Sequence, residues 1–223
     1  MPDQVLVFDV NETLLDIEAV NPIFGRIFND QQAMRQWFSE LILYSQSLTL
    51  SGDYHPFGEL AVAVLRMVAD IRGMQLSERD IAEFSQRMAT LPAHRDAAPA
   101  LEMLSAAGFH MVTLTNSSAE AGQQALAQSG LDRFFARQFS VEEVKRFKPA
   151  PENYTHVAQV LGKEARSLRL IAAHNWDVLG AIACGWKGAL VTRPGNAALS
   201  IGGQPDIVEK DLLALAQRII DMD

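Results

Sequence analysis

The chain has 223 residues and a mass of 24.6 kDa, which fits one large domain or one domain with an insertion, but not three independent units. Hydrophobic residues make up 48% of the chain and charged residues 21%, a balance that argues against intrinsic disorder, collagen-like repeats and coiled coil. The formal net charge of −8 provides no basic surface for phosphates, so nucleic acid is not an expected partner.

The cysteine count and the N-terminal segment bear on location. Cys184 is the single cysteine, so no internal disulfide can form and a reducing compartment is expected. Residues 1–4 carry an acid where a signal peptide needs a base, and no apolar run approaches the roughly 18 residues of a membrane span. These features predict a cytoplasmic protein that does not bind membranes.

Short apolar runs alternate with helical patterns along most of the chain. Residues 5–8 are too few for a buried helix and predict a central parallel strand that ends at Asp9. Similar runs predict strands over 109–115, 168–172 and 188–192, and the stretches between them predict helices over 99–107, 119–129, 151–161 and 178–184. This alternation predicts an α/β fold with a doubly wound, Rossmann-like parallel sheet.

The stretch from residue 16 to residue 96 breaks the alternation. It carries long helical patterns over 29–48, 57–72 and 77–90, the last opened by a capping pattern at Ser77 and Asp80. We therefore expect an α/β core over 1–15 and 97–223, closed by a C-terminal helix, with an inserted helical-bundle cap over 16–96. Ligands bind at the carboxyl ends of strands in open α/β sheets, so this cap should cover the site.

Four polar clusters lie at the predicted strand ends or just beyond them: residues 9–13, 115–118, 148–149 and 174–177. Each cluster alone has an ordinary interpretation as a helix N-cap, a surface Lys-Pro pair or an acid in the first turn of a helix. The carboxyl ends of parallel strands meet at one edge of the sheet, so the four clusters can share one pocket. Their convergence favours a functional site.

These clusters resemble the motifs of a known family. The run FDVNETLLD at 8–16 resembles the first motif of the haloacid dehalogenase superfamily, Asp-x-x-x-Thr-Leu, in which the leading Asp is a covalent nucleophile. Residues 114–116, 148–149 and 176–177 are similar to the second, third and fourth motifs, in that order. The inserted helices match one cap type of the superfamily, and Lys148-Pro149 followed by Asn153-Tyr154 resembles its L-2-haloacid dehalogenase branch.

Two departures separate this chain from phosphatases of the same superfamily. Asn11 stands where phosphatases usually carry a second Asp, and an amide cannot shuttle a proton to a leaving alcohol. Ala172 and Ala173 stand where those relatives place carboxylates for Mg²⁺, which leaves Asp177 as the only nearby acid. The sequence therefore favours chemistry without a metal or other cofactor, with a Mg²⁺-dependent small-molecule phosphatase as an alternative.

Two further departures separate it from a standard dehalogenase. Phe38 replaces the cap arginine that the branch uses near the halide and the substrate carboxylate, while Ala172 and His174 replace a serine and an asparagine. His174 could act as a donor or as a base, or be a histidine satisfied by backbone groups. These losses keep a non-catalytic small-acid binding protein as a second alternative. Candidates for the missing charge are His55, His94 and Arg95, although a solvated surface role is commoner.

The resemblance implies a hydrolase that releases halide from a small 2-haloalkanoic acid through a covalent aspartyl ester. The expected catalytic residues are Asp9 as nucleophile, Lys148 as its electrostatic partner, Thr13 and Asp177. The expected substrate-binding residues are Asn11, Phe38, Phe57, Thr115, Asn116, Tyr154, His174 and Trp176. The branch includes dimers, so a homodimer is one expectation besides the small organic acid partner. Replacing Phe38 by Arg should raise kcat/KM if the pocket has room.

Overall fold

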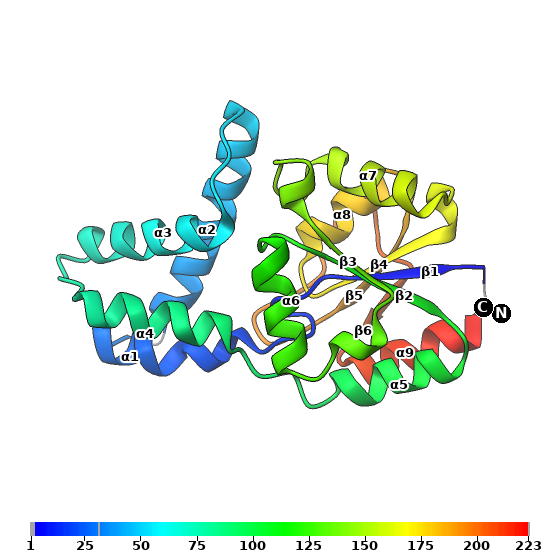
Figure 1. Ribbon diagram of the computed structural model, residues 1–223, viewed down its shortest axis with the longest axis horizontal. Helices are drawn as coiled ribbons and strands as arrows, with labels where there is room; N and C mark the ends of the chain where they lie inside the picture. The colour runs from blue at the N-terminus through cyan, green and yellow to red at the C-terminus, as the bar shows by residue number, and fades with distance from the viewer. Residues whose placement is uncertain (1–2, 31, 223) are drawn as a thin grey trace.

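Across residues 3–30 and 32–222, which the computed structural model describes, six parallel strands form one sheet in the order β3-β2-β1-β4-β5-β6 (Figure 1). The strands are β1 Val5–Phe8, β2 His110–Thr115, β3 Arg137–Ser140, β4 Leu168–Ala172, β5 Lys187–Val191 and β6 Ile207–Glu209. The predicted doubly wound α/β fold is confirmed. Residues 1, 2, 31 and 223, which belong to the predicted N-terminal segment, first cap helix and closing helix, lie outside the described residues.

The edge strands β3 and β6 were not predicted. Strand β3 has one apolar residue among four, and β6 is only three residues long. Only part of each strand is buried, because an edge strand has a neighbour on one side only. A strand of this kind lacks the continuous apolar run that marks the central strands of a parallel sheet. Sequence periodicity is therefore a weak signal at both edges.

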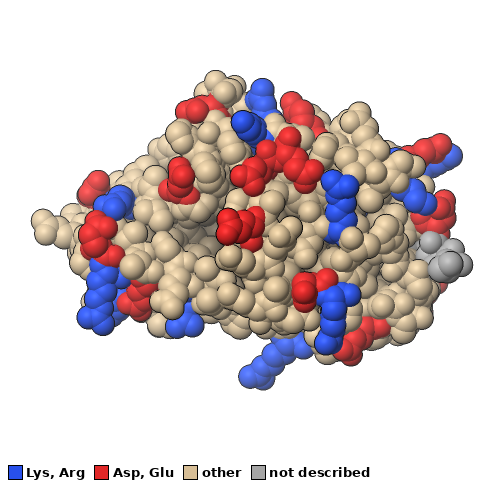
Figure 2. Space-filling view, in the orientation of Figure 1, with Lys and Arg blue, Asp and Glu red and all other residues tan. Residues whose placement is uncertain are grey.

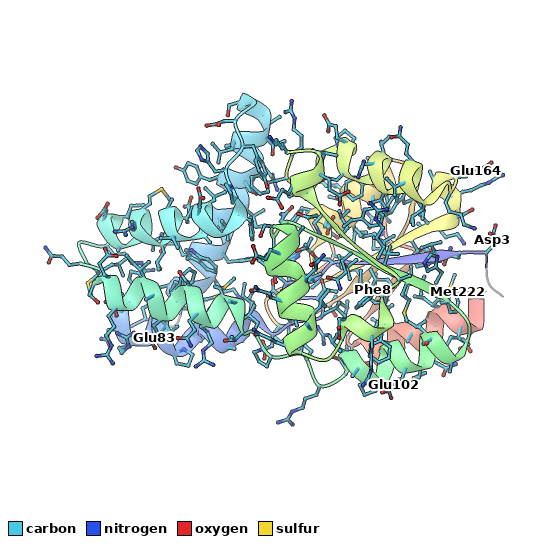
Figure 3. All side chains as sticks on the ribbon, in the orientation of Figure 1. Asp3, Phe8, Glu83, Glu102, Glu164 and Met222 are labelled. Carbon is cyan, nitrogen blue, oxygen red and sulfur yellow. The ribbon has the colours of Figure 1, made fainter. Side chains whose placement is uncertain are left out.

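Successive residues of β1 face opposite sides of the sheet. Leu6 and Phe8 belong to the larger apolar core, whereas Val5 and Val7 belong to a second core on the opposite face. Helices α5 (Ala97–Ala106) and α9 (Leu212–Met222) cover the first face, and α7 (Pro151–Leu161) and α8 (Asn175–Ala183) cover the second (Figure 1). Helix α6 (Ala119–Gln128) packs beside β3. Figure 3 shows Phe8 within these layers and Glu102 on the outside of the molecule.

The segment between β1 and α5 contains helices and no strand among its described residues. It consists of η1 Ile17–Val20, α1 Asn21–Phe28, α2 Gln32–Ser51, α3 Phe57–Ile71 and α4 Glu78–Ala89. In Figure 1, helices α1 to α4 gather on the left of the sheet, at the end toward which β1 runs. The division of the chain at residues 15/16 and 96/97 stays a prediction.

Two details of this segment bear on the sequence analysis. The predicted capping pattern is present, since the Ser77 hydroxyl accepts from the Asp80 N–H at 3.2 Å and the Asp80 carboxylate accepts from the Ser77 N–H at 3.0 Å. The helix predicted over 29–48 differs, because Asn29 has φ of 49° and ends α1, and a new helix α2 begins at residue 32. A left-handed Asn at a helix end is a common stop signal.

The segment has its own aromatic centre. The Trp37 ring lies 5.5 Å from Phe24 and 5.1 Å from Phe84, and its Nε1 donates to the carbonyl of Ala61 at 2.9 Å. These contacts join all four helices, because the residues come from α1, α2, α3 and α4. The bundle therefore presents a fixed surface to the sheet, whereas Glu83 of α4 lies on its outer side (Figure 3).

On the visible face of the molecule, acidic and basic side chains are interspersed rather than separated (Figure 2). No helix in the described parts of the chain combines the length and the apolar character that crossing a bilayer requires.

Candidate active site

The polar clusters predicted at the strand ends do meet at one edge of the sheet. Phe8 of β1 pairs with Thr113 of β2 and Ile171 of β4, so the residues that follow these positions lie side by side. Asp9 follows β1, and His174 comes two residues after β4. The order of the strands reverses at β1, which is where ligands bind in doubly wound sheets.

Asp9 is buried and held by two donors. Its Oδ1 accepts from Lys148 Nζ at 2.7 Å, and its Oδ2 accepts from the Thr13 hydroxyl at 2.6 Å. The Thr13 oxygen is itself fixed by the N–H of Ala173 at 2.8 Å. Burial by itself raises the pKa of Asp9, but the positive charges of Lys148 and His174 hold it below its ordinary value. Asp9 is therefore a carboxylate anion at neutral pH.

Lys148 bridges two buried carboxylates. Its Nζ donates to Asp9, to Asp177 Oδ2 at 2.5 Å and to the carbonyl of Leu114 at 3.0 Å. The Tyr154 hydroxyl donates to the other oxygen of Asp177 at 2.6 Å. Burial lowers the pKa of Lys148, but Asp177 and Asp9 raise it above its usual value, so this lysine is an ammonium ion. These contacts fit the roles expected of Lys148 as the electrostatic partner of Asp9 and of Asp177 and Tyr154 as supports of Lys148.

The second motif holds backbone groups of the site. Asn116 Oδ1 accepts from the backbone N–H of Lys148 at 3.0 Å, and the Thr115 hydroxyl accepts from the N–H of Ser117 at 3.1 Å. The Asn11 amide donates to the Ser117 hydroxyl at 3.2 Å. Thr13 thus holds the nucleophile directly, whereas Thr115 and Asn116 fix the loops around it.

His174 lies between two carboxylates and two aromatic rings. Its Nε2 meets Glu12 Oε2 at 2.7 Å, and its Nδ1 is 3.3 Å from Asp9 Oδ2. The His174 ring stacks on two aromatic rings, with its centroid 5.4 Å from that of Phe38 and 5.0 Å from that of Trp176. Burial lowers the pKa of His174, but Asp9 and Glu12 raise it to about 9. The interpretation of a histidine satisfied by backbone groups therefore does not fit, since its partners are carboxylates.

The sequence analysis missed Glu12 and Arg35. The Arg35 guanidinium donates to the carboxylates of Glu12 and Glu18 and, at 2.9 Å, to the carbonyl of Pro194. Burial raises the pKa of Glu12, but His174 and Arg35 lower it below its ordinary value. The signal was present in the sequence, because Glu12 lies inside the first motif and Arg35 is one helical turn before position 38 on α2.

The three cap candidates for positive charge lie elsewhere. His55 is exposed and pairs with Asp53 at 3.4 Å, and Arg95 is exposed. His94 Nε2 lies 3.0 Å from the carbonyl of Glu12, and burial lowers the pKa of this histidine. Arg35 is the cap cation that reaches the first motif.

One cavity adjoins Asp9, and a larger cavity lies next to it. The smaller, of about 20 Å³, is lined by Asp9, Asn11, Phe38, Ile42, Phe57, Thr115, Asn116, His174 and Trp176. All the predicted substrate-binding residues are among them except Tyr154, which lies behind Asp177. The larger cavity, of about 350 Å³, lies between α3, α4 and α6 and shares Asn11 and Phe57 with the smaller one. Phe38 forms one wall of the smaller cavity, next to His174.

No group of three or more His, Cys, Asp or Glu side chains within residues 3–30 and 32–222 is arranged to hold a metal ion. The oxygens of Asp9 and Asp177 accept hydrogen bonds from Lys148, Thr13 and Tyr154. The acids of the site are therefore engaged with protein donors.

Comparisons with known proteins agree with this geometry. A family model for haloacid dehalogenase-like hydrolases matches residues 4–185. The (S)-2-haloacid dehalogenase H-109 of Pseudomonas putida is 27% identical over 99% of both chains, and (S)-2-haloacid dehalogenase 4A of Burkholderia cepacia is 30% identical over 85% of this chain and 83% of its own. The solved structure of L-2-haloacid dehalogenase from Xanthobacter autotrophicus with chloropropionic acid covalently bound has a TM-score of 0.89, with 24% identity over 99% of both chains.

Proposed function

This chain belongs to the haloacid dehalogenase-like hydrolase family, and we propose that it releases halide from a small (S)-2-haloalkanoic acid through a covalent ester on Asp9, without a metal ion. The observation that carries the proposal is the buried carboxylate of Asp9, kept anionic by Lys148 at 2.7 Å. The two relatives named as (S)-2-haloacid dehalogenases support the substrate class. The covalently bound chloropropionic acid in the third protein supports the ester.

The first half of the reaction is a displacement at carbon 2 of the substrate. An oxygen of Asp9 forms a bond to this carbon, and the halide leaves with the electron pair of the carbon–halogen bond. Halide needs no proton to leave, so Asn11 in place of a second acid does not impede this step. Water then attacks the carbonyl carbon of the ester, which yields the 2-hydroxy acid and restores Asp9.

His174 supplies positive charge where Phe38 has replaced the arginine of the branch. With a pKa of about 9, its imidazole is charged at neutral pH and lies at the wall of the smaller cavity. An imidazolium attracts the carboxylate of the substrate and the departing halide. Arg35 does not serve this purpose directly, because Glu12 and Glu18 neutralise it.

The two cavities suggest how a substrate reaches Asp9. The smaller one has room for about one water molecule, so a haloacid requires the walls to move. Asn11 and Phe57 separate it from the cavity of about 350 Å³, which is lined mainly by apolar groups of α3, α4 and α6. A rotation of the Phe57 side chain would join the two cavities and place the alkyl chain of a substrate in the larger one.

The setting of the protein is also part of the proposal. The acidic composition and the single cysteine support a cytoplasmic enzyme that acts on a free organic acid rather than on nucleic acid or a membrane. A homodimer stays a prediction, which analytical ultracentrifugation of the protein can check.

The decisive experiment is a single turnover in heavy-oxygen water with the enzyme in excess over (S)-2-chloropropionate. The label should enter the protein first, on the Asp9 peptide, because water attacks the ester at the carbonyl carbon. Asp9→Asn should keep the fold and release no halide, and (R)-2-chloropropionate should react poorly. Label that appears directly in the product would contradict the ester.

The same measurements distinguish the alternatives. Hydrolysis of phosphate monoesters that is lost with a chelator and restored by Mg²⁺ would indicate a phosphatase. Saturable binding of 2-chloropropionate without release of halide would indicate a binding protein.

A further inference from the structure

His174 has one ring nitrogen that no hydrogen bond uses. Its Nε2 meets Glu12 at 2.7 Å, whereas Nδ1 lies 3.3 Å from Asp9 Oδ2 without the alignment of a hydrogen bond. The side chain is only 4% exposed, and Phe38 and Trp176 stack against the ring. The ring is therefore held so that Nδ1 points at the nucleophile from inside the pocket.

The other polar groups next to Asp9 are already engaged. Lys148 donates to Asp9, Asp177 and the carbonyl of Leu114, which uses all three of its N–H groups. Asp177 accepts on both carboxylate oxygens, from Lys148 and from Tyr154. An ammonium ion has no lone pair that could take a proton. Asp177 is fully buried and does not line the cavity beside Asp9, so it does not meet a water there.

The cavity beside His174 is large enough for a water molecule. The cavity of about 20 Å³ is lined by both His174 and Asp9. This volume holds about one water molecule. A water molecule in this cavity would lie next to both the carbonyl carbon of the Asp9 ester and Nδ1 of His174.

We propose that His174 is the base that removes a proton from the water that hydrolyses the Asp9 ester, and that Glu12 is the positioning residue that orients its ring. The proposal rests on the proposed function, because it concerns the second half of that reaction. It assigns a catalytic role to a residue at which this chain departs from the branch it resembles.

The protons balance over the cycle. After halide leaves, the imidazolium of His174 loses one proton to solvent, which is the proton released overall when a haloacid becomes a hydroxy acid and halide. Neutral Nδ1 then takes a proton from water as its oxygen bonds to the ester carbon, and returns it to the departing alkoxide. The Asp9 carboxylic acid so formed gives its proton to His174, which restores the starting carboxylate and imidazolium.

The charges around the ring favour this sequence. Burial lowers the pKa of His174, and in the free enzyme Asp9 and Glu12 raise it to about 9. An ester at Asp9 is uncharged, so one of the two carboxylates that stabilise the imidazolium disappears while the burial remains. Lys148 beside Asp9 and Arg35 beside Glu12 are both cations, and both favour the neutral imidazole. The helices α2 and α8 contribute uncharged aromatic rings.

The test separates the two half-reactions in His174→Gln, which keeps a hydrogen-bonding side chain but cannot take a proton. With enzyme in excess over (S)-2-chloropropionate, rapid quenching should show slower release of halide than in the wild type, because the imidazolium charge is lost, and then an ester that persists on the Asp9 peptide. Ester hydrolysis should be slower than in the wild type by about 10²–10⁴-fold, the usual contribution of a general base. Hydrolysis of the ester at the wild-type rate would overturn the proposal.

His156→Gln is the matched control. His156 also pairs with a glutamate, Glu143 at 2.9 Å, but lies on α7 away from the site, so both half-reactions should match those of the wild type. Release of halide and of hydroxy acid at the same rate by His174→Gln, with no ester left on the Asp9 peptide, would overturn the proposal. Absence of halide release by the wild type would instead overturn the proposed function and, with it, the ester.

The pH dependence tests the proposal even if His174→Gln does not fold. In the wild type, the rate of ester hydrolysis should rise with pH to a plateau as the imidazole loses its proton. Glu12→Gln removes an anion that stabilises the imidazolium, so it should move this rise to lower pH, which a merely structural role would not do. A rate that is constant between about pH 5 and pH 10 in the wild type would overturn the base role.

Discussion

Lys148→Met provides a severe test of the electrostatics of the site. Methionine has a similar length but no charge, and it removes three hydrogen bonds: to Asp9 at 2.7 Å, to Asp177 at 2.5 Å and to the carbonyl of Leu114 at 3.0 Å. Both carboxylates are buried, with exposed fractions of 4% and 0%. Without the ammonium ion, each carboxylate either stays charged beside a neutral side chain or takes up a proton.

The expected loss follows from this burial. Removing one partner of a buried ion pair costs about 3–5 kcal/mol, because the remaining charge has neither water nor a counter-ion. We expect the free energy of unfolding at pH 7 to fall by about this amount. Turnover should be lost as well, since the pKa of Asp9 rises when the ammonium is removed and the nucleophile is weakened.

The pH dependence has a definite sign. In the wild type the pKa of Asp9 is lowered on folding, so its contribution to stability is present above about pH 4 and is lost as the pH falls toward the lowered value. In Lys148→Met the buried carboxylates protonate more readily. The difference in unfolding free energy between the two proteins should therefore shrink as the pH falls from 7 toward about 4.

Urea unfolding of both proteins at several pH values measures this difference. Lys163→Met is the matched control, because Lys163 forms a 2.7 Å pair with Asp3 on the exposed surface and its replacement should leave stability unchanged. Wild-type stability in Lys148→Met at pH 7, or a difference that does not change with pH, would refute the reasoning.

Three more expectations concern the surroundings of the site. Chelation should leave halide release unchanged, because the buried carboxylates are engaged with protein donors; a loss that Mg²⁺ restores would contradict this. Phe38→Arg should lower kcat/KM for 2-chloropropionate rather than raise it, because a second cation would crowd the charged His174 ring 5.4 Å away; a gain would show that the pocket opens and lacks positive charge. Gly180→Ala should cost about 1–3 kcal/mol in urea unfolding and reduce turnover, because the new Cβ would lie 2.6 Å from the Tyr154 hydroxyl, whereas Gly58→Ala meets no atom within 4 Å and should not destabilise; equal stabilities would contradict the packing argument.

The sequence by itself determined the α/β alternation, the inserted helices and the position of Asp9 at the end of the first strand. Central strands of a parallel sheet are buried on both faces, so they appear as continuous apolar runs, and the strand ends then place Asp9 and Thr115 at one edge. The family motifs added Lys148 and Asp177, which the structure brings within hydrogen-bond distance of each other.

Only the tertiary structure decided the state of His174. Its two carboxylate partners are separated from it by more than 160 positions in the chain, and the rings that cover it come from α2 and α8. Local periodicity reports burial along one element, but the charge of an imidazole depends on the distances to groups that other elements bring to it. The same holds for Arg35, whose partner Glu12 meets it only when the inserted helices pack on the core.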